Sequence, residues 1–368
     1  MMQRRLWMAV WLAALAAGTA VAQPAAAPAP ARLAETVAEA RQRVQAALAE
    51  QGFPGIAIAV SVEGETVWSE GFGYADLEHR VPVWPTTKFR IGSISKPLTA
   101  AAVAQLVAAG RLDADAPVQR YVPTFPEKRW PVTTRQLGGH LAGVRHYRGA
   151  EFLIRDPYAS VTAALDVFKA DTLLHEPGTR YAYSSYGWNL LSAVVEGAAG
   201  EPFLAYMRNQ VFRPLGMHHT VADHPDSLIL QRAGFYDYGT DGALVNAPFV
   251  NNSYKWAGGG FLSTVEDLLR FGNAHLGDDF LPPEAKALLF TEQTTEAGEG
   301  VGYGFGWFVG TDDAGRRQWS HGGGSIGGTS WLGLQPDARL VVVGLVNQSR
   351  ADLGVVREVY RLFLDALE

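Results

Sequence analysis

Apolar residues near the start of the chain first recur at helical spacing and then crowd together as they do in strands. In residues 33–52, leucines and valines stand four or seven positions apart, which predicts an amphipathic helix that ends at Gly52. Residues 56–62 are almost wholly apolar, and residues 66–74 follow after a short turn, so both ranges predict strands. The folded part of the chain is therefore expected to begin with a helix followed by two adjacent strands.

The end of the chain returns to strand-like patterning. Short apolar ranges, separated by turn residues rich in glycine, proline and aspartate, predict strands at 304–309, 318–321, 329–334 and 340–346. Residues 352–367 predict a closing helix. Strands from both ends of a chain, joined by short turns, favour one mostly antiparallel sheet covered by helices. The expected fold class is α/β (α+β).

Between these two parts the periodicity is mainly helical. Helices are expected at 93–109, 161–168, 187–199, 203–211 and 265–276. We therefore expect residues 33–368 to form one domain. Its α/β part would comprise 33–90 and 277–368, and 91–276 would form an inserted, mainly helical part packed on the sheet.

The first 22 residues have the pattern of a secretory signal peptide, with two arginines, an apolar run and the small residues Ala20-Val21-Ala22. The alternative is a membrane anchor, but the run is shorter than the roughly 20 residues that a spanning helix needs. Cleavage after Ala22 would leave a Pro/Ala linker at 23–32. We expect export, to the periplasm or the medium, without a stable membrane span.

Composition excludes several functional classes. The chain is 48% hydrophobic and 18% charged, as in ordinary globular proteins. A net charge of −6 without a Lys/Arg cluster argues against a nucleic-acid partner. The absence of cysteine excludes disulfides and thiolate metal sites. His218 and His219 are adjacent, and His175 lacks the second histidine of a zinc helix, so neither a metal nor a cofactor is expected.

The first candidate for chemistry is Ser93-Ile94-Ser95-Lys96, at the start of a predicted helix, where residues three apart share a face. A serine hydroxyl is a poor nucleophile until a base takes its proton. Lys96 serves as that base only if its pKa falls from the ordinary value of about 10.4. Otherwise Tyr183 takes the proton while Lys96 stays charged, and both assignments remain open. The simpler alternative is a capping serine with a solvated lysine.

Two further segments carry candidate residues. Tyr183 and Ser185 lie on a loop before a predicted helix, where a tyrosine can reach a cleft, although most tyrosines are simply core aromatics. His321 ends a strand and is followed by Gly322, Gly323 and Gly324, where backbone can approach a ligand closely. We name the Gly324 and Ser93 N–H groups as candidates for an oxyanion hole. His321 is a candidate to orient the substrate, the alternative being a strand-end histidine bonded to backbone.

Together, Ser-x-x-Lys, Tyr-Ser-Ser 90 residues later and His-Gly-Gly after another 138 resemble the three motifs of the serine β-lactamase and penicillin-binding-protein superfamily, in its class C-like branch. Residues 252–264 resemble the mitochondrial serine β-lactamase-like proteins of animals. The resemblance implies a β-lactamase/transpeptidase-like fold and an acyl-enzyme at Ser93, with proton transfers by Lys96 and Tyr183. It further implies a peptidase, a D-alanyl carboxypeptidase-type enzyme or an esterase, acting on a small molecule or on a peptide such as a cell-wall peptide.

Two departures from the family pattern bear on the substrate. The asparagine of Tyr-x-Asn is Ser185 here, and the lysine of Lys-Thr-Gly is His321. Both argue against β-lactam hydrolysis, which stays as the nearer alternative. An alternative of another class is a non-catalytic binding or filament-forming protein on the same fold, and self-assembly is open.

Overall fold

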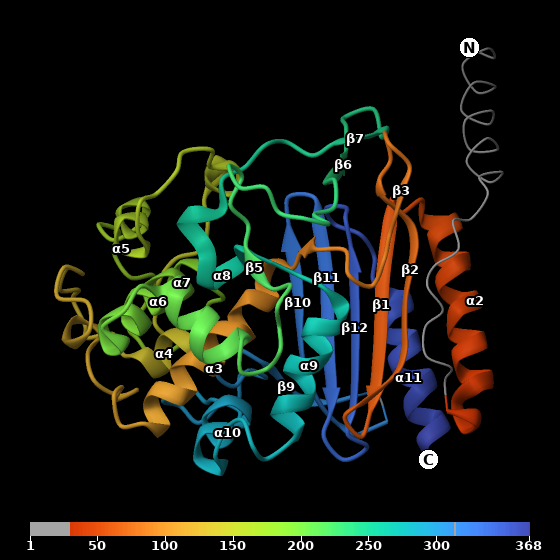
Figure 1. Cartoon of the computed structure of the whole chain (residues 1–368). Helices are drawn as coiled ribbons and strands as arrows, with labels where there is room; N and C mark the ends of the chain where they lie inside the picture. Colours follow the sequence, from red (N-terminus) through yellow and green to blue (C-terminus); the bar gives the residue numbers. More distant parts are fainter. Residues whose placement is uncertain (1–29, 313) are drawn as a thin grey trace.

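A computed structural model describes residues 30–312 and 314–368, so the predicted signal peptide and most of the predicted linker lie outside the described residues. Its largest sheet is antiparallel, with strand order β3-β2-β1-β12-β11-β10-β9 (Figure 1). The strands are β1 (Gly55–Val62), β2 (Glu65–Asp76), β3 (Val81–Pro82), β9 (Phe308–Thr311), β10 (Arg317–Ser325), β11 (Gly328–Gln335) and β12 (Leu340–Val346). Because β1 pairs with β12, the sheet joins both ends of the chain, as the sequence predicts.

Both faces of this sheet are covered, which explains why its central strands are apolar throughout. Helices α2 (Ala34–Gln51) and α11 (Gly354–Leu367) lie side by side on one face (Figure 1). Alternate residues of β1 divide between two cores: Ile56 and Ile58 join the core under α2 and α11, whereas Ala57 and Ala59 join the core on the other side. The result is a layered α/β architecture that confirms the expected fold class.

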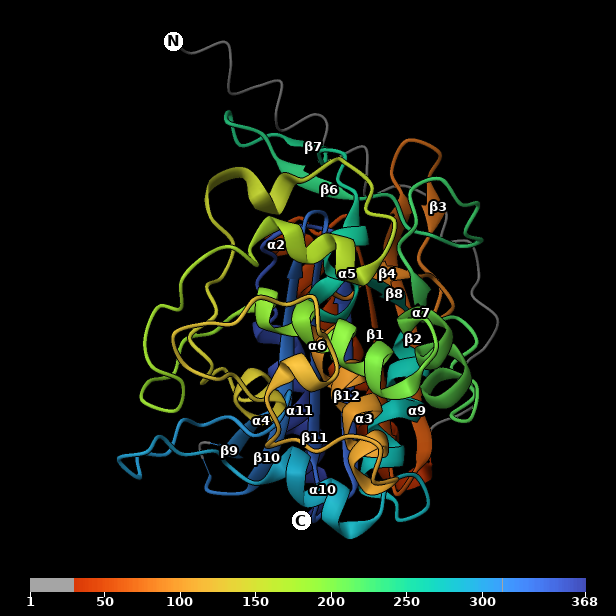
Figure 2. The same ribbon diagram turned by 90° about the vertical axis from the view of Figure 1, so that its left-hand side faces the viewer.

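The other face of the sheet carries the helical part (Figure 2). Its α-helices are α3 (Ser95–Ala108), α4 (Thr134–Gly138), α5 (Val161–Ala164), α6 (Ser185–Ala199), α7 (Phe203–Tyr206), α8 (Trp256–Gly259), α9 (Val265–Leu276) and α10 (Pro283–Phe290). Helix α9 packs directly on β12 and β1, although it falls within the range predicted as the inserted part.

Shorter elements complete the fold, with η1 leading into α2 and most of the others in the helical part. The 3-10 helices are η1 (Ala31–Leu33), η2 (Gly92–Ile94), η3 (Val118–Arg120), η4 (Gly149–Leu153), η5 (Leu165–Val167) and η7 (Asn252–Lys255), and η6 (Met207–Phe212) is a π-helix. A small sheet has the order β4 (Phe89–Arg90), β8 (Phe261–Ser263) and β5 (Val221–Ala222), and β6 (Tyr236–Tyr238) pairs with β7 (Leu244–Asn246).

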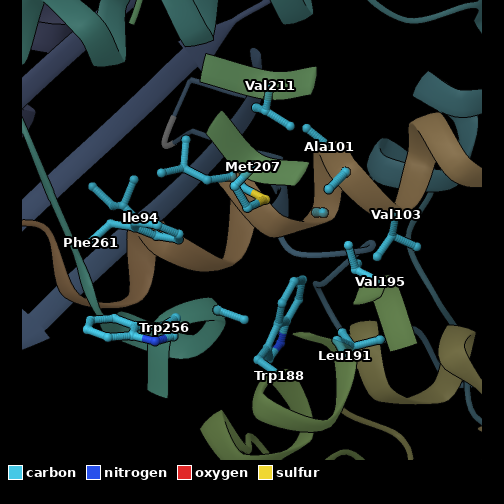
Figure 3. Packing of buried hydrophobic residues seen from close by; sticks show 14 of the residues in the cluster. Ile94, Ala101, Val103, Trp188, Leu191, Val195, Met207, Val211, Trp256 and Phe261 are labelled. Carbon is cyan, nitrogen blue, oxygen red and sulfur yellow. The ribbon is translucent and has the colours of Figure 1, made fainter. Parts of the chain in front are cut away.

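Helix α3 runs through the centre of the helical part and is buried on nearly every side, as expected for a helix that is apolar all round. It packs against α6, α8, α10 and η6. Figure 3 shows side chains of these elements meeting around it, including Trp188, Leu191, Met207 and Trp256. The helix that follows Ser93 is therefore a rigid support.

The strand predicted at 304–309 is wrong for residues 304–307. Strand β9 begins only at Phe308, and a hydrogen bond from the Gly304 N–H to the Trp307 carbonyl closes a turn before it. Phe305 and Trp307 are fully buried. Aromatic residues at every second position imitate the strand pattern here, but they pack into the helical core. The helix predicted at 203–211 also differs, since α7 gives way to the π-helix η6.

Candidate active site

Ser93 lies in η2, between the end of β4 and the start of α3. The sequence predicts this serine at the start of a helix, and the structure places it in the short 3-10 helix that leads directly into α3. The backbone before it touches the end of β10. Gly92 has φ +48°, and a Cβ atom there would lie 2.7 Å from the Gly324 nitrogen and 2.6 Å from the Gly324 oxygen. Only glycine accommodates both this conformation and this approach. The fold thus holds Ser93 beside Gly324.

A buried ion pair anchors the strand that leads to Ser93. Arg90 Nε donates to Asp223 at 2.6 Å and Arg90 Nη1 donates to the Ile326 carbonyl at 2.8 Å. The guanidinium also lies 3.8 Å from the Phe235 ring centroid, and Asn252 donates to Asp223 at 2.8 Å. These contacts connect β4 to the β10–β11 turn and to the segment before α8.

The Lys96 amine lies at the centre of the site and has three close oxygen neighbours. Its Nζ is 2.9 Å from Ser93 Oγ, 3.0 Å from Ser185 Oγ and 2.8 Å from the Gly258 carbonyl oxygen. Burial, and secondly the positive charge of Lys255, hold the pKa of Lys96 well below its usual range. A neutral amine can donate to Ser185 and Gly258 and still offer its lone pair to the Ser93 hydroxyl. The site therefore supplies a base for that proton.

Tyr183 also lies next to the nucleophile, because its side chain is close enough to interact with that of Ser93. Burial raises the pKa of Tyr183 well above its usual value, so the phenol keeps its proton. Lys96 Nζ lies 4.8 Å from the centroid of this ring, and the His140 ring packs against it at 4.2 Å between centroids. Ser93, Lys96 and Tyr183 are thus brought together, as predicted.

Two histidines that sequence reasoning missed hold the Tyr183 segment in place. The His140 carbonyl accepts from Ala182 N–H at 2.8 Å, and His140 Nδ1 accepts from Ser184 N–H at 3.0 Å. His146 Nδ1 accepts from Ser185 N–H at 3.1 Å. His140 has φ +61°, an uncommon conformation for a residue with a side chain. Such strain is typical of functional segments and is the signal, invisible in the sequence, that marks this loop.

His321 is buried behind the site and does not line its cavity. Its Nδ1 is 2.6 Å from the Gly322 oxygen and its Nε2 is 3.0 Å from the Tyr303 hydroxyl. Since a carbonyl can only accept, Nδ1 carries the proton and Nε2 accepts from Tyr303. Burial lowers the pKa of His321 to about 3, so the ring is neutral. Both nitrogens are engaged, and direct contact with a substrate stays a prediction.

The site opens into a cavity of about 460 Å³. Four of the predicted site residues line it, namely Ser93, Tyr183, Ser185 and Gly324, whereas Gly323 packs instead against Ile91 and Ser330. The other lining residues are His146, Tyr147, Phe152, Asp237, Lys255, Gly258, Gly259, Ser325, Ile326, Thr329, Ser349 and Arg350.

Tyr147 and Lys255 are among the lining residues that sequence reasoning missed. The Tyr147 side chain interacts with that of Ser185, and Lys255 is 1% exposed. Lys255 falls in the 252–264 stretch that carried the family resemblance, and a lysine among aromatic and glycine residues was the available signal.

In residues 30–312 and 314–368, no group of three or more His, Cys, Asp or Glu side chains is arranged to hold a metal ion. No helix in the same ranges has the length and apolar content to cross a bilayer.

A serine beside a buried lysine and a tyrosine, at the edge of an antiparallel sheet packed on a helical part, is the arrangement of the penicillin-recognising serine hydrolases. The chain belongs to the beta-lactamase family, whose family model, described as Beta-lactamase, matches residues 40–365.

Similarity to individual proteins agrees with that family. The chain is 36% identical to the mitochondrial serine beta-lactamase-like protein of Homo sapiens, over 83% of this chain and 73% of the relative. Among solved structures it is similar to the octameric penicillin-binding protein homologue from Pyrococcus abyssi, with TM-score 0.78, 27% identity and coverage of 89% of this chain and 77% of that one. It is also similar to a D-stereospecific amidohydrolase from Streptomyces sp., with TM-score 0.75, 25% identity and coverage of 87% and 97%.

Proposed function

We propose that the protein is an exported serine hydrolase that forms an acyl-enzyme at Ser93 with amide or ester substrates. The observation that carries this proposal is the position of the Lys96 amine, buried and 2.9 Å from Ser93 Oγ. A solvated lysine beside a capping serine would be exposed, whereas Lys96 is 0% exposed. Burial of the Lys96 amine disfavours its charged form, which serves catalysis because the amine can then exchange a proton with its neighbours.

In the proposed acylation, Ser93 Oγ attacks the substrate carbonyl carbon while its proton passes to Lys96 Nζ. The Ser93 and Gly324 N–H groups face the oxyanion. When the scissile bond breaks, the leaving amine or alcohol takes a proton from Tyr183. In deacylation a water attacks the ester carbonyl and gives its proton to the Tyr183 phenolate. Ser93 then recovers its proton from Lys96, so both residues return to their starting states.

We propose a peptidase, a D-alanyl carboxypeptidase-type enzyme or an esterase in preference to a β-lactamase. The Ser185 hydroxyl stands where the family has an asparagine amide, and its neighbours are the Lys96 amine and the Tyr147 side chain. It is therefore already engaged by the catalytic groups. The similarity to a D-stereospecific amidohydrolase supports substrates with D-amino acids, such as cell-wall peptides.

Labelling with a fluorophosphonate followed by peptide mass spectrometry tests the nucleophile. We expect an adduct on Ser93, loss of labelling and turnover in Ser93→Ala, and full labelling in the control Ser227→Ala, whose serine is exposed. If Ser93 stays unlabelled in a folded protein, the acyl-enzyme proposal is wrong and the non-catalytic alternative is favoured. A panel of nitrocefin, p-nitrophenyl esters and D-Ala-D-Ala peptides then ranks the substrate classes, and a dominant nitrocefin rate would favour the β-lactamase.

Export and assembly are proposed separately. The signal-peptide pattern supports export, and amino-terminal sequencing of the secreted protein is expected to begin at Gln23. The octameric archaeal relative supports self-assembly, which light scattering on the purified protein tests through its molar mass.

A further inference from the structure

The amine of Lys255 is a buried cation that takes no part in the proposed reaction. Lys255 ends η7, is 1% exposed and lines the same cavity as Ser93. Within the described ranges no hydrogen bond or ion pair joins this amine to another residue. Its neighbours are aromatic rings, with Nζ 4.1 Å from the Phe152 centroid, 5.4 Å from that of Tyr254 and 5.8 Å from that of Tyr147. A buried charge is costly unless it is paired, which points to a partner brought by a ligand.

The carboxylates near Lys255 are bonded to other residues. Asp223 acts on Lys255 through its charge, but its Oδ2 accepts from Arg90 at 2.6 Å and from Asn252 at 2.8 Å. Asp237, which lines the same cavity, accepts from Arg350 at 2.6 Å. Burial, and secondly the charge of Arg90, lower the pKa of Lys255 to about 7. A negative group in the cavity would raise that pKa and keep the amine charged.

The surroundings of Lys255 indicate which end of a substrate it meets. Tyr147 links it to the nucleophile's neighbours, because the Tyr147 ring lies beside the Lys255 amine and its side chain interacts with that of Ser185. Tyr183, which protonates the leaving group in the proposed function, packs instead against His140, with the His321 ring 6.5 Å away between centroids. The leaving group then lies towards β10, and the acyl group lies along the wall made by Ser185, Tyr147 and Lys255.

We propose that Lys255 binds a carboxylate on the acyl portion of the substrate, so that the enzyme prefers acyl groups that carry a negative charge at their far end. The inference rests on the proposed acyl transfer at Ser93 and adds a substrate class to it. Phe152 and Tyr147 exclude water around the amine and strengthen its attraction to an anion.

Matched esters test the preference. 4-Nitrophenyl hydrogen glutarate carries the acyl carboxylate, 4-nitrophenyl pentanoate is its neutral counterpart, and 4-carboxyphenyl pentanoate carries the charge on the leaving group. The measured quantity is the ratio of kcat/KM for each charged ester to that for 4-nitrophenyl pentanoate, after subtraction of the enzyme-free rate. A ratio cancels any effect of Lys255 on the Lys96 base that all the esters share.

We expect Lys255→Met and Lys255→Gln to lower the glutarate ratio about 10- to 100-fold, as for loss of a hydrogen bond between charged groups. Lys255→Arg should retain most of the ratio. Lys169→Met, which removes a charge outside the cavity, should retain all of it. An unchanged glutarate ratio in the Met and Gln variants overturns the proposal, and so does a change confined to 4-carboxyphenyl pentanoate.

Binding separates this inference from the proposed function. The glutaryl and pentanoyl 4-nitroanilides are titrated calorimetrically into Ser93→Ala and into Ser93→Ala/Lys255→Met. Tighter binding of the glutaryl anilide to the first protein, lost in the second, supports the anion site even if Ser93→Ala proves to retain turnover and the acyl-enzyme fails. Equal binding of the two anilides to Ser93→Ala overturns the anion site and leaves the acyl-enzyme intact.

Discussion

The protonation state of one amine governs what the site can do. Lys96 has three oxygen neighbours, and an ammonium there would donate to all of them, including Ser93 Oγ. A donated hydrogen bond lowers the electron density on the nucleophile, whereas an accepted one raises it. Because burial and the charge of Lys255 both lower the pKa of Lys96, the neutral amine is the form that burial favours. The activity should therefore depend on pH through this group.

We expect kcat/KM for a neutral ester to rise with pH along a limb that ends well below pH 10.4, the pKa of an ordinary lysine. Lys255→Met removes a positive charge that lowers the pKa of Lys96, so the limb should move to higher pH. Lys169→Met should leave it in place. A pH–rate profile with 4-nitrophenyl acetate measures the limb, and a wild-type limb near pH 10 would contradict a neutral base at physiological pH.

Tyr183→Phe tests the second proton transfer. The ring packing against His140 is retained in phenylalanine, but the hydroxyl that interacts with Ser93 is lost. We expect kcat/KM, which reports acylation and not deacylation, to fall about 10²- to 10⁴-fold, the usual contribution of general acid catalysis. The loss should be smaller for 4-nitrophenyl esters, whose leaving group needs little protonation, than for amides. Equal losses on esters and amides would mean that Tyr183 does not serve the leaving group.

At this scale the sequence was informative where the chemistry is local. Ser93 and Lys96 are three residues apart on one helical turn, so their spacing alone brings them together. Lys255 and His146 lie on segments that are far apart in the sequence and come together only in the folded protein. No periodicity in the sequence predicts that they line one cavity. His321 was found by its motif, yet its bond to Tyr303 turns it away from the cavity.

At the scale of elements, a glycine joins the nucleophile turn to the sheet. Gly92→Ala introduces a Cβ at φ +48° and within 2.8 Å of three Gly324 backbone atoms. Strain and overpacking together should cost about 2–5 kcal/mol of unfolding free energy. Displacement of Ser93 from Gly324 should lower kcat/KM about 100-fold. Gly110→Ala is the matched control, since Gly110 has φ +67° with nothing within 4 Å, and it should cost only about 1–2 kcal/mol with activity kept.

Urea unfolding and ester kinetics of the two glycine variants give the comparison. If Gly92→Ala behaves like Gly110→Ala in both measurements, the approach of β10 is not what requires glycine at position 92.

The buried pair that anchors β4 gives a second prediction at this scale. Asp223→Ala leaves Arg90 charged and buried, so we expect a loss of about 3–5 kcal/mol in the free energy of unfolding. Asp115→Ala removes the partner of Arg135 in an exposed pair, which should cost about 1 kcal/mol or less. Chemical denaturation of both variants measures the difference. Similar losses would mean that water or a rearranged side chain compensates Arg90.

Local pattern was enough to predict most elements of the main sheet, whose central strands are short apolar ranges bounded by turn residues, and its covering helices, whose apolar residues repeat at helical spacing. It failed where alternating aromatic residues are buried in a turn. Tyr303, Phe305 and Trp307 alternate like a strand, but all three are fully buried, and a turn separates them from β9. A single sheet built from both ends of the chain was predicted from the strand patterns, whereas the particular pairing of β1 with β12 and the packing of α9 on that pair were not.

At the scale of the whole molecule, stability should depend on pH through histidines buried without charge. Burial is the largest cause in each case: it lowers the pKa of His321 to about 3, that of His275 to about 4, and that of His140 well below its usual value. In the unfolded chain these groups bind protons below about pH 6.5. The unfolded state then binds more protons than the folded state, so stability is present above pH 6.5 and is lost as pH falls towards 4.

Each such histidine contributes about 1.4 kcal/mol per pH unit within this window, so the three histidines together contribute a loss of roughly 4 kcal/mol between pH 7.5 and 5.5. The lowered pKa values of the buried Lys96 and Lys255 amines add to this loss in the same direction. Urea titrations at the two pH values measure it. His275→Leu isolates one contributor away from the active site, where the ring lies among Phe271, Phe280 and Trp307. That variant should lose about 1.4 kcal/mol less than the wild type over the same interval. An identical pH dependence in both proteins would show that His275 takes up its proton without unfolding the chain.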